Sequence, residues 1–183
     1  MLQIKALENI TIRTIQPADN LQVSKIIRET LVEFKANHPG TVYYDASTDD
    51  LFSLFTQPRS IYYVAESEGK IVGGAGIFPT MGLPEGTCEL VKMYLQPVVR
   101  GKGLGKMLIE KALDFARQAG FANVYIETMP ELGKAMKVYE KFGFKYLDQQ
   151  LGNSGHFGCK IWMLLTLPSS SSRDKFSEEG QLI

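Results

Sequence analysis

Cysteine and histidine are scarce in this sequence, and each occurs only twice in 183 residues. Cys88 and Cys159 match no metal-binding spacing, so we expect no metal site. Nothing in the sequence suggests secretion, and we therefore expect both cysteines to be free thiols in a reducing compartment. Cys88 precedes Glu89, but a small buried thiol is the simpler role for it.

Long apolar runs and an excess of one charge are also absent. No stretch approaches the ~18 apolar residues of a membrane span, and the first residues lack the charged and apolar regions of a signal peptide. Lysine plus arginine and aspartate plus glutamate number 20 each, so no basic excess indicates a nucleic-acid binder. We expect a cytoplasmic protein whose partners include neither a membrane nor nucleic acid.

The length and the end of the chain predict one domain followed by a tail. A chain of 183 residues can bury a substantial core as one domain. After Pro168 the sequence continues with four serines and then mostly charged and polar residues, a composition typical of flexible segments. We therefore expect a single domain over residues 1–167 and a flexible serine-rich tail over 168–183.

Apolar residues at helical and alternating spacings place the elements along the chain. A helix that begins at Asp19 or Asn20 is expected to stop at residues 38–40. Strands and helices follow one another in a mixed order, which predicts an α/β (α+β) fold with a central mixed sheet covered by helices. Further helices are predicted over 104–119 and 131–142, and strands over 10–15, 61–66, 70–77, 89–95, 124–128 and 159–167.

The most informative segment is residues 100–107, Arg-Gly-Lys-Gly-Leu-Gly-Lys-Met, between a predicted strand and a predicted helix. Its three glycines let the backbone approach a ligand closely, and the helix start adds unpaired N–H groups and the positive end of the helix dipole. Arg100, Lys102 and Lys106 crowd this helix start, where a bound anion would offset them. The segment predicts a phosphate site; a glycine-rich turn with solvated lysines is the alternative.

Two common phosphate motifs do not fit this segment. A P-loop requires a glycine five positions before the Gly-Lys pair and a serine or threonine after it, but the sequence has arginine and methionine in these places. A dinucleotide fingerprint that begins with Gly101 and Gly103 requires a third glycine where Lys106 stands. Neither motif therefore explains the segment.

The remaining pattern, Arg-x-x-Gly-x-Gly over residues 100–105, resembles the pyrophosphate loop of the GNAT superfamily of acetyl-CoA-dependent N-acetyltransferases. Residues 89–97, Glu-Leu-Val-Lys-Met-Tyr-Leu-Gln-Pro, look like the strand that leads into this loop in the family. Residues 135–144 are close to the family's Ala-x-x-Leu-Tyr-Glu-Lys-x-Gly-Phe segment. The resemblance extends over roughly residues 10–167.

The resemblance implies a GNAT-like fold, with a central mixed and mostly antiparallel sheet flanked by helices, and acetyl-CoA as acetyl donor. It also implies that backbone groups of the strand before the loop pair with the pantetheine arm, and that the N–H of Leu95 polarises the thioester carbonyl. The implied cofactor-binding residues are Met93, Tyr94, Leu95, Arg100, Gly101, Lys102, Gly103, Leu104, Gly105 and Lys106.

Glu89 is the predicted catalytic base. In a regular strand, residues 89, 91, 93 and 95 face one side, so we expect Glu89 to lie on the same face as the residues near the thioester. It also matches the position where some GNAT members carry a catalytic glutamate. An amine with a pKa of about 10.4 must lose a proton before it attacks, and Glu89 would take that proton through a water. A structural hydrogen bond at a strand end is the alternative.

Tyr139 is the predicted catalytic acid, because it matches the tyrosine that fills this role in the family. A phenol with a pKa of about 10 can donate a proton to a departing thiolate. The alternative is an aromatic packing residue. Leu132 departs from the family pattern, since many members carry an asparagine there that contacts the cofactor.

Three further residues are weaker candidates near the acceptor amine. His156 lies in a glycine-rich loop that could close over the acceptor, and His38 lies in an early loop that precedes Asp45. Asp45 could pair with an ammonium group. For the histidines, hydrogen-bonding surface roles are the alternative.

These residues predict an N-acetyltransferase that moves an acetyl group directly from acetyl-CoA to a primary amine, of a small molecule or of a protein. No covalent enzyme intermediate is expected, and the chain could pair as a homodimer. The alternative function is a GNAT-like module that binds acetyl-CoA or CoA as a sensor or partner subunit. Release of free thiol in the presence of an amine distinguishes the two.

Overall fold

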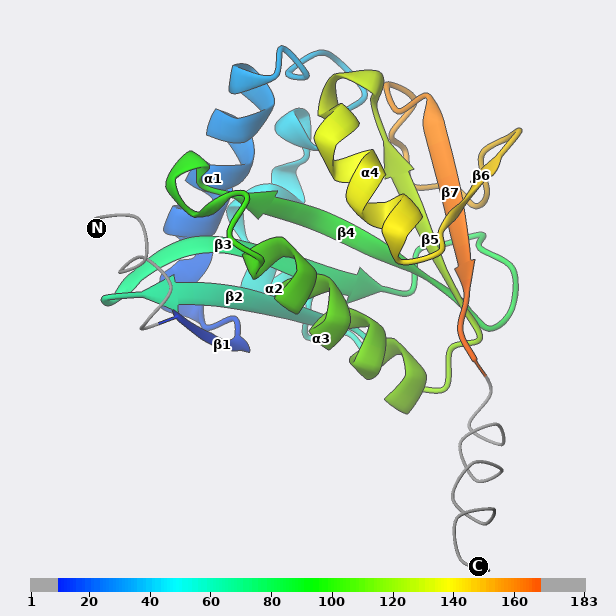
Figure 1. Ribbon diagram of the computed structural model, residues 1–183, viewed down its shortest axis with the longest axis horizontal. Helices are drawn as coiled ribbons and strands as arrows, with labels where there is room; N and C mark the ends of the chain where they lie inside the picture. The colour runs from blue at the N-terminus through cyan, green and yellow to red at the C-terminus, as the bar shows by residue number, and fades with distance from the viewer. Residues whose placement is uncertain (1–9, 169–183) are drawn as a thin grey trace, which may run out of the picture.

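The computed structural model describes residues 10–168, which form a seven-stranded sheet with helices on both faces (Figure 1). The strands are β1 (Ile10–Thr14), β2 (Ile61–Ser67), β3 (Lys70–Phe78), β4 (Thr87–Leu95), β5 (Asn123–Thr128), β6 (Lys145–Leu147) and β7 (Ile161–Thr166). The α-helices are α1 (Asn20–Glu33), α2 (Leu51–Leu54), α3 (Leu104–Gln118) and α4 (Gly133–Lys141).

The strands lie in the order β1-β2-β3-β4-β5-β7-β6. All neighbouring strands are antiparallel except β4 and β5, which run parallel. The predicted α/β class with a mixed, mostly antiparallel sheet is therefore confirmed. Strand β6 was not predicted, because it has only three residues, two of them exposed, and these carry too little alternation to be recognised.

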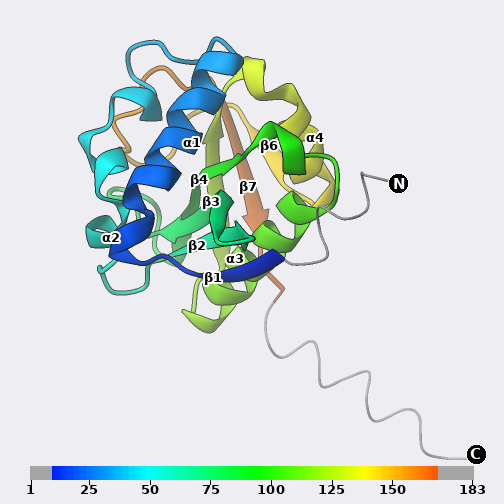
Figure 2. The ribbon, with the colours of Figure 1, turned by 90° about the vertical axis from the view of Figure 1, so that its left-hand side faces the viewer.

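Two apolar clusters hold the helices on the sheet. Residues of α3, such as Leu104 and Leu108, pack with β5 residues and with Tyr139 of α4 on one face. Residues of α1, such as Ile27 and Leu31, pack on the other face. Figure 2 shows this arrangement, with α1 and α2 on one side of the strands and α4 on the other.

Helix α1 ends earlier than the sequence predicted, at Glu33 instead of at residues 38–40. Lys35 has φ +56°, in the left-handed region. Its N–H donates to the Val32 carbonyl at 3.0 Å, and the N–H of Ala36 donates to the Leu31 carbonyl at 2.8 Å. This is a Schellman termination, which usually places a glycine where Lys35 stands and so escaped the sequence pattern.

Strands β4 and β5 separate along their length. They pair only over Thr87–Glu89 and Asn123–Tyr125, and beyond these residues the two strands point in different directions (Figure 1). The carboxyl-terminal parts of the two strands therefore carry backbone and side-chain groups that are free to face a ligand.

Strand β4 contains a bulge at Lys92 and Met93. Opposite Gly74–Gly76 of β3, two steps along β3 correspond to three steps along β4. Lys92 has φ +50°, and its carbonyl accepts a hydrogen bond of 2.8 Å from the buried phenol of Tyr62. The extra residue bends the strand just before the loop that leads to α3.

The bulge also reverses which face each side chain occupies. Val91 packs with the cluster under α1, whereas Met93 and Leu95 pack with the cluster under α3. Because side chains alternate up to the bulge, Glu89 lies on the face of Val91. The prediction that residues 89, 91, 93 and 95 share one face is therefore wrong.

Two predictions concern residues outside the described range. Residues 1–9 and, apart from Pro168, the serine-rich tail over 168–183 lie outside the described residues. The predicted domain limits therefore stay predictions. Within residues 10–168, no helix combines the length and the apolar character that crossing a membrane requires.

Candidate active site

The separation of β4 from β5 opens a cavity of about 1080 Å³. Its lining includes five residues of the glycine loop, which we define as residues 100–106, and three carboxylates, which we call the acidic end: Asp45, Glu89 and Glu127. A single cavity thus joins the predicted phosphate site to the predicted base.

The glycine loop has the geometry of an anion site. Gly101 has φ +73°, and Gly103, the N-cap of α3, has φ +90°, conformations that favour glycine. A Cβ built on either residue would meet no atom within 4 Å, so the space beside the backbone is open. The N–H of Met107 donates to the Gly103 carbonyl at 3.1 Å, which leaves the N–H groups of residues 104–106 without partners in the helix.

Arg100 is held by the protein itself. Its guanidinium donates to both carboxylate oxygens of Glu33 in α1, at 2.6 and 2.8 Å, and its Nε donates to the Leu95 carbonyl at 2.8 Å. Lys106 lies 3.5 Å from Glu110 one turn along α3. Contrary to the sequence argument, the charge of Arg100 needs no bound anion to offset it, and the residue ties the glycine loop to α1.

The backbone of β4 offers a free donor to the cavity at Leu95. Gln96 donates its N–H to the Val72 carbonyl at 2.8 Å, which makes them a hydrogen-bonded pair. Because such pairs alternate along an antiparallel ladder, the N–H of Leu95 points away from β3 and toward the gap before β5. The same alternation directs the backbone of Tyr94 toward Gly74, so Leu95 and not Tyr94 presents its N–H to a ligand.

Most of the predicted cofactor residues line the cavity, although Lys102 and Leu104 do not. The Leu104 side chain is fully buried in the core, which leaves only its N–H for a ligand. Leu132 lines the cavity at the start of α4 and makes no side-chain cap. The predicted residues found in the lining are Met93, Tyr94, Leu95, Arg100, Gly101, Gly103, Gly105 and Lys106.

Glu89 is 3 % exposed and reaches the cavity from β4. Burial raises the pKa of its carboxyl to about 7, although a hydrogen bond from the Thr80 hydroxyl opposes the shift, and the carboxylate of Glu127 adds to it. A group whose pKa lies near neutral pH can take up and release a proton in each turnover.

Tyr139 is both packed and placed on the cavity wall. It is 6 % exposed, and its ring centroid lies 5.9 Å from that of Phe144. Burial raises the pKa of its phenol to about 12. The hydroxyl is therefore protonated at neutral pH and can donate a hydrogen bond.

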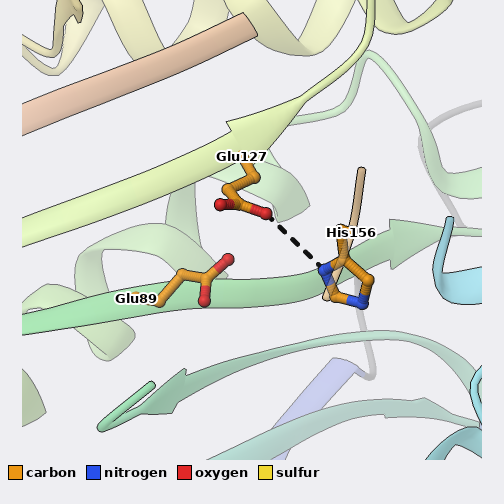
Figure 3. Close-up of side chains that lie close together, drawn as sticks. All are labelled: Glu89, Glu127 and His156. Atoms are coloured by element: carbon orange, nitrogen blue, oxygen red, sulfur yellow. Dashed lines mark ion pairs between the residues drawn. The ribbon is translucent and has the colours of Figure 1, made fainter. Parts of the chain in front are cut away.

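Three elements bring Glu89, Glu127 and His156 together, as Figure 3 shows. Glu89 comes from β4, Glu127 from β5 and His156 from the loop between β6 and β7. A carboxylate oxygen of each glutamate and a ring nitrogen of His156 all lie within 4.8 Å of one another. Side chains of these types can ligate a metal ion, for which His156 would have to be unprotonated.

His156 is an imidazolium at neutral pH. Its Nε2 lies 2.8 Å from Asp45, and its Nδ1 lies 3.7 Å from Glu127. Burial alone would lower the pKa of His156, but Asp45 and Glu127 outweigh it and raise the pKa to about 9. Asp45, His156 and Glu127 therefore form a chain of ion pairs.

Lys92 extends this chain. Its Nζ lies 3.1 Å from Asp45 and donates to the Thr48 hydroxyl at 3.3 Å. Burial lowers the pKa of Lys92, and Asp45 opposes that shift. Burial would raise the pKa of Asp45, but His156 and Lys92 lower it to about 2. Asp45 is therefore ionised between two cations.

Sequence reasoning missed part of the acidic end. Glu127 and Lys92 were not considered as site residues. The signal that could have found them is a charged residue inside a predicted strand, since charged side chains are rarely buried without a partner. Lys92 lies in the strand that leads into the glycine loop. Asp45 and His156 line the cavity as suggested, whereas His38 does not. Cys88 is fully buried, as expected.

Comparisons with known proteins agree with this geometry. The profile of the acetyltransferase (GNAT) family matches residues 24–144. The chain is 40% identical over 150 residues to the uncharacterized N-acetyltransferase YjgM of Escherichia coli K12, which covers 81% of this chain and 90% of YjgM.

Solved structures share the fold. A GNAT-family acetyltransferase from Staphylococcus aureus Mu50 superposes with a TM-score of 0.77 at 16% identity, over 87% of this chain and 99% of its own. YncA from Salmonella typhimurium, solved with acetyl-CoA, superposes with a TM-score of 0.68 at 23% identity, over 88% of this chain and 96% of its own. With the family profile and the relationship to YjgM, these findings show that the chain belongs to the acetyltransferase (GNAT) family of N-acetyltransferases.

Proposed function

We propose that the protein transfers an acetyl group from acetyl-CoA directly to a primary amine inside the cavity between β4 and β5. The observation that carries this proposal is the position of Glu89, a buried carboxyl with a pKa of about 7, in the same cavity as the glycine loop. Acetyl-CoA as the donor is supported by family membership and by its presence in the similar Salmonella structure.

The residues of this chain fit that donor. The unpaired N–H groups of residues 104–106 and the open space beside Gly101 and Gly103 suit a pyrophosphate. The N–H of Leu95 points into the gap where β4 leaves β5 and suits the oxygen of a thioester, where negative charge develops during transfer. The loop would hold the donor, and the strand would polarise it.

Glu89 would accept the proton of the acceptor ammonium through a water. An amine with a pKa of about 10.4 is mostly protonated at neutral pH, so the proton must leave before the nitrogen lone pair can attack the carbonyl carbon. A carboxylate with a pKa of about 7 is a stronger base than an ordinary glutamate. The proposed order is therefore deprotonation, attack and departure of the thiolate.

Tyr139 would stabilise the departing sulfur. A phenol whose pKa is about 12 is a weaker acid than a thiol, whose ordinary pKa is about 8.5. Its main contribution would therefore be a hydrogen bond to the developing thiolate, with protonation completed as the product leaves. This role requires that the hydroxyl face the cavity, which Tyr139 lines.

The test is release of free CoA thiol from acetyl-CoA in the presence of a broad panel of primary amines. We expect turnover for the unmodified protein, and a loss of about 10²-fold for Glu89→Gln, which keeps the size of the side chain and removes the titrating group. Part of the loss should be recovered at high pH, where the amine is already neutral.

CoA-dependent thermal stabilisation provides the control for this assay, since binding to the folded state raises stability by mass action. Glu89→Gln should retain the stabilisation. An unmodified protein that is stabilised by CoA but releases no thiol with any amine would contradict the proposed transfer. An unchanged pH profile in Glu89→Gln would show that another group takes the proton.

A further inference from the structure

The acidic end holds three carboxylates but only two cations. Asp45 lies between Lys92 and His156, and Glu127 lies against His156. Among the described residues no ion pair involves Glu89, which accepts its hydrogen bond from the neutral Thr80 hydroxyl. One carboxylate of the three is therefore left without a cation of its own.

His156 occupies the centre of this arrangement. Its side chain is 15 % exposed, and its two ring nitrogens face two different carboxylates, as Figure 3 shows for Glu127. Only an imidazolium carries an N–H on both nitrogens and a positive charge that attracts both carboxylates. The His156 backbone N–H also donates to the Ser154 hydroxyl at 3.0 Å, and that hydroxyl donates to Glu127, so the loop is fixed relative to β5.

We propose that His156 is a positioning residue: as an imidazolium between Asp45 and Glu127 it occupies both of these carboxylates and leaves Glu89 as the one that accepts the proton of the acceptor amine. This inference rests on the proposed function, because it concerns which carboxylate serves as base. It assigns His156 a role through Glu89, without contact to the reacting atoms.

The charges around Glu89 support this role. Glu89 faces Glu127 from β5, His156 from the loop before β7 and Lys92 from its own strand. Burial raises the pKa of the neighbouring thiols Cys88 and Cys159 to about 12, so they stay neutral. The imidazolium is thus the cation that offsets Glu127 beside Glu89.

Removal of the imidazolium would leave Glu89 and Glu127 as two buried carboxylates within 4.8 Å of each other. Two such groups cannot both ionise easily and come to share a proton, which raises the upper apparent pKa of the pair. Lys92 does not replace the missing charge, because it already pairs with Asp45. Glu89 would then be protonated at a pH where the unmodified enzyme is active.

The experiment measures kcat/KM against pH for the unmodified protein and three variants, with one amine that it acetylates. His156→Gln should move the acid limb of the profile to higher pH by about one unit or more. His156→Lys, which retains a positive charge, should bring the limb back toward that of the unmodified protein. His38→Gln, which changes the other histidine of the chain, should leave the profile unchanged.

A second measurement does not depend on turnover. In the proton NMR spectrum, the histidine signal that disappears in His156→Gln should keep its imidazolium shift through neutral pH and titrate near pH 9. Titration at or below the ordinary value of 6.5 would overturn the inference. The inference would also be overturned if His156→Gln is folded and stabilised by CoA but shows an unchanged acid limb and uniformly lower rates. That result would indicate that His156 only anchors the loop. Absence of turnover with every amine would instead overturn the proposed function.

Discussion

Burial and neighbouring charges together determine the protonation of the individual residues in the cavity. Glu89 and His156 are both removed from water, yet burial raises the pKa of Glu89 to about 7, whereas two carboxylates raise that of His156 to about 9. The two shifts have different causes: burial disfavours the charged carboxylate of Glu89, and Glu127 adds to that effect, whereas the carboxylates of Asp45 and Glu127 outweigh the effect of burial on His156. At neutral pH the cavity therefore holds one carboxyl that can titrate beside a set of fixed charges.

At the same scale, we predict the effect of Tyr139→Phe. The change removes one oxygen and keeps the ring beside Phe144, so packing should change little. CoA affinity should also be retained, because the glycine loop is untouched. The value of kcat should fall, since the departing sulfur loses its hydrogen-bond donor. A loss confined to the chemical step indicates an interaction that is made in the transition state.

The measurement is kcat with a working amine, together with CoA affinity by calorimetric titration. Equal turnover in Tyr139→Phe would return this tyrosine to the role of a packing residue. A loss of CoA affinity as large as the loss of kcat would indicate that the hydroxyl contacts the bound donor in the ground state.

At the scale of elements, the bulge in β4 and the start of α3 shape the cavity. The bulge, supported by the phenol of Tyr62, directs Glu89 to one face and Leu95 to the other. The start of α3 then presents unpaired N–H groups beside two glycines with positive φ. The two features place the proposed base and the proposed anion site along one strand and the loop that follows it.

Gly103→Asp tests the glycine loop, and Gly120→Asp is its matched control. Both glycines have positive φ and open space where a Cβ would stand, at the start and just beyond the end of α3. Each change should therefore add a similar backbone strain, about 1–2 kcal/mol. Only Gly103→Asp places bulk and negative charge at the proposed pyrophosphate site, so only it should abolish the CoA-dependent rise in Tm.

The measurement is Tm by scanning fluorimetry over a series of CoA concentrations. A CoA-dependent shift that survives in Gly103→Asp would show that the pyrophosphate lies elsewhere. Loss of the shift in both variants would show that the strained backbone, and not the position of the charge, is responsible.

Much of this architecture could be predicted from the sequence, and the failures have physical causes. The spacing of Gly101, Gly103 and Gly105 identified the loop because glycine conformation is local. The faces of β4 were mispredicted because the bulge at Lys92 depends on pairing with β3. The ion pairs of Asp45, Glu127 and His156 join segments far apart in the chain, and no local pattern reports such contacts.

For the whole molecule, the central claim is that one cavity holds both substrates at once. The glycine loop and the acidic end line the same space of about 1080 Å³. A covalent route would need a reactive nucleophile there, and burial raises the pKa of Cys159, which lines the cavity, to about 12, so its thiolate is scarce at neutral pH. Direct transfer in a ternary complex is the outcome that this arrangement favours.

The measurement that tests this claim most directly is the initial velocity of thiol release, with acetyl-CoA and the amine each varied at several fixed concentrations of the other. Transfer within a ternary complex predicts double-reciprocal lines that intersect. Parallel lines, the pattern of a ping-pong reaction through an acetylated enzyme, would contradict the account.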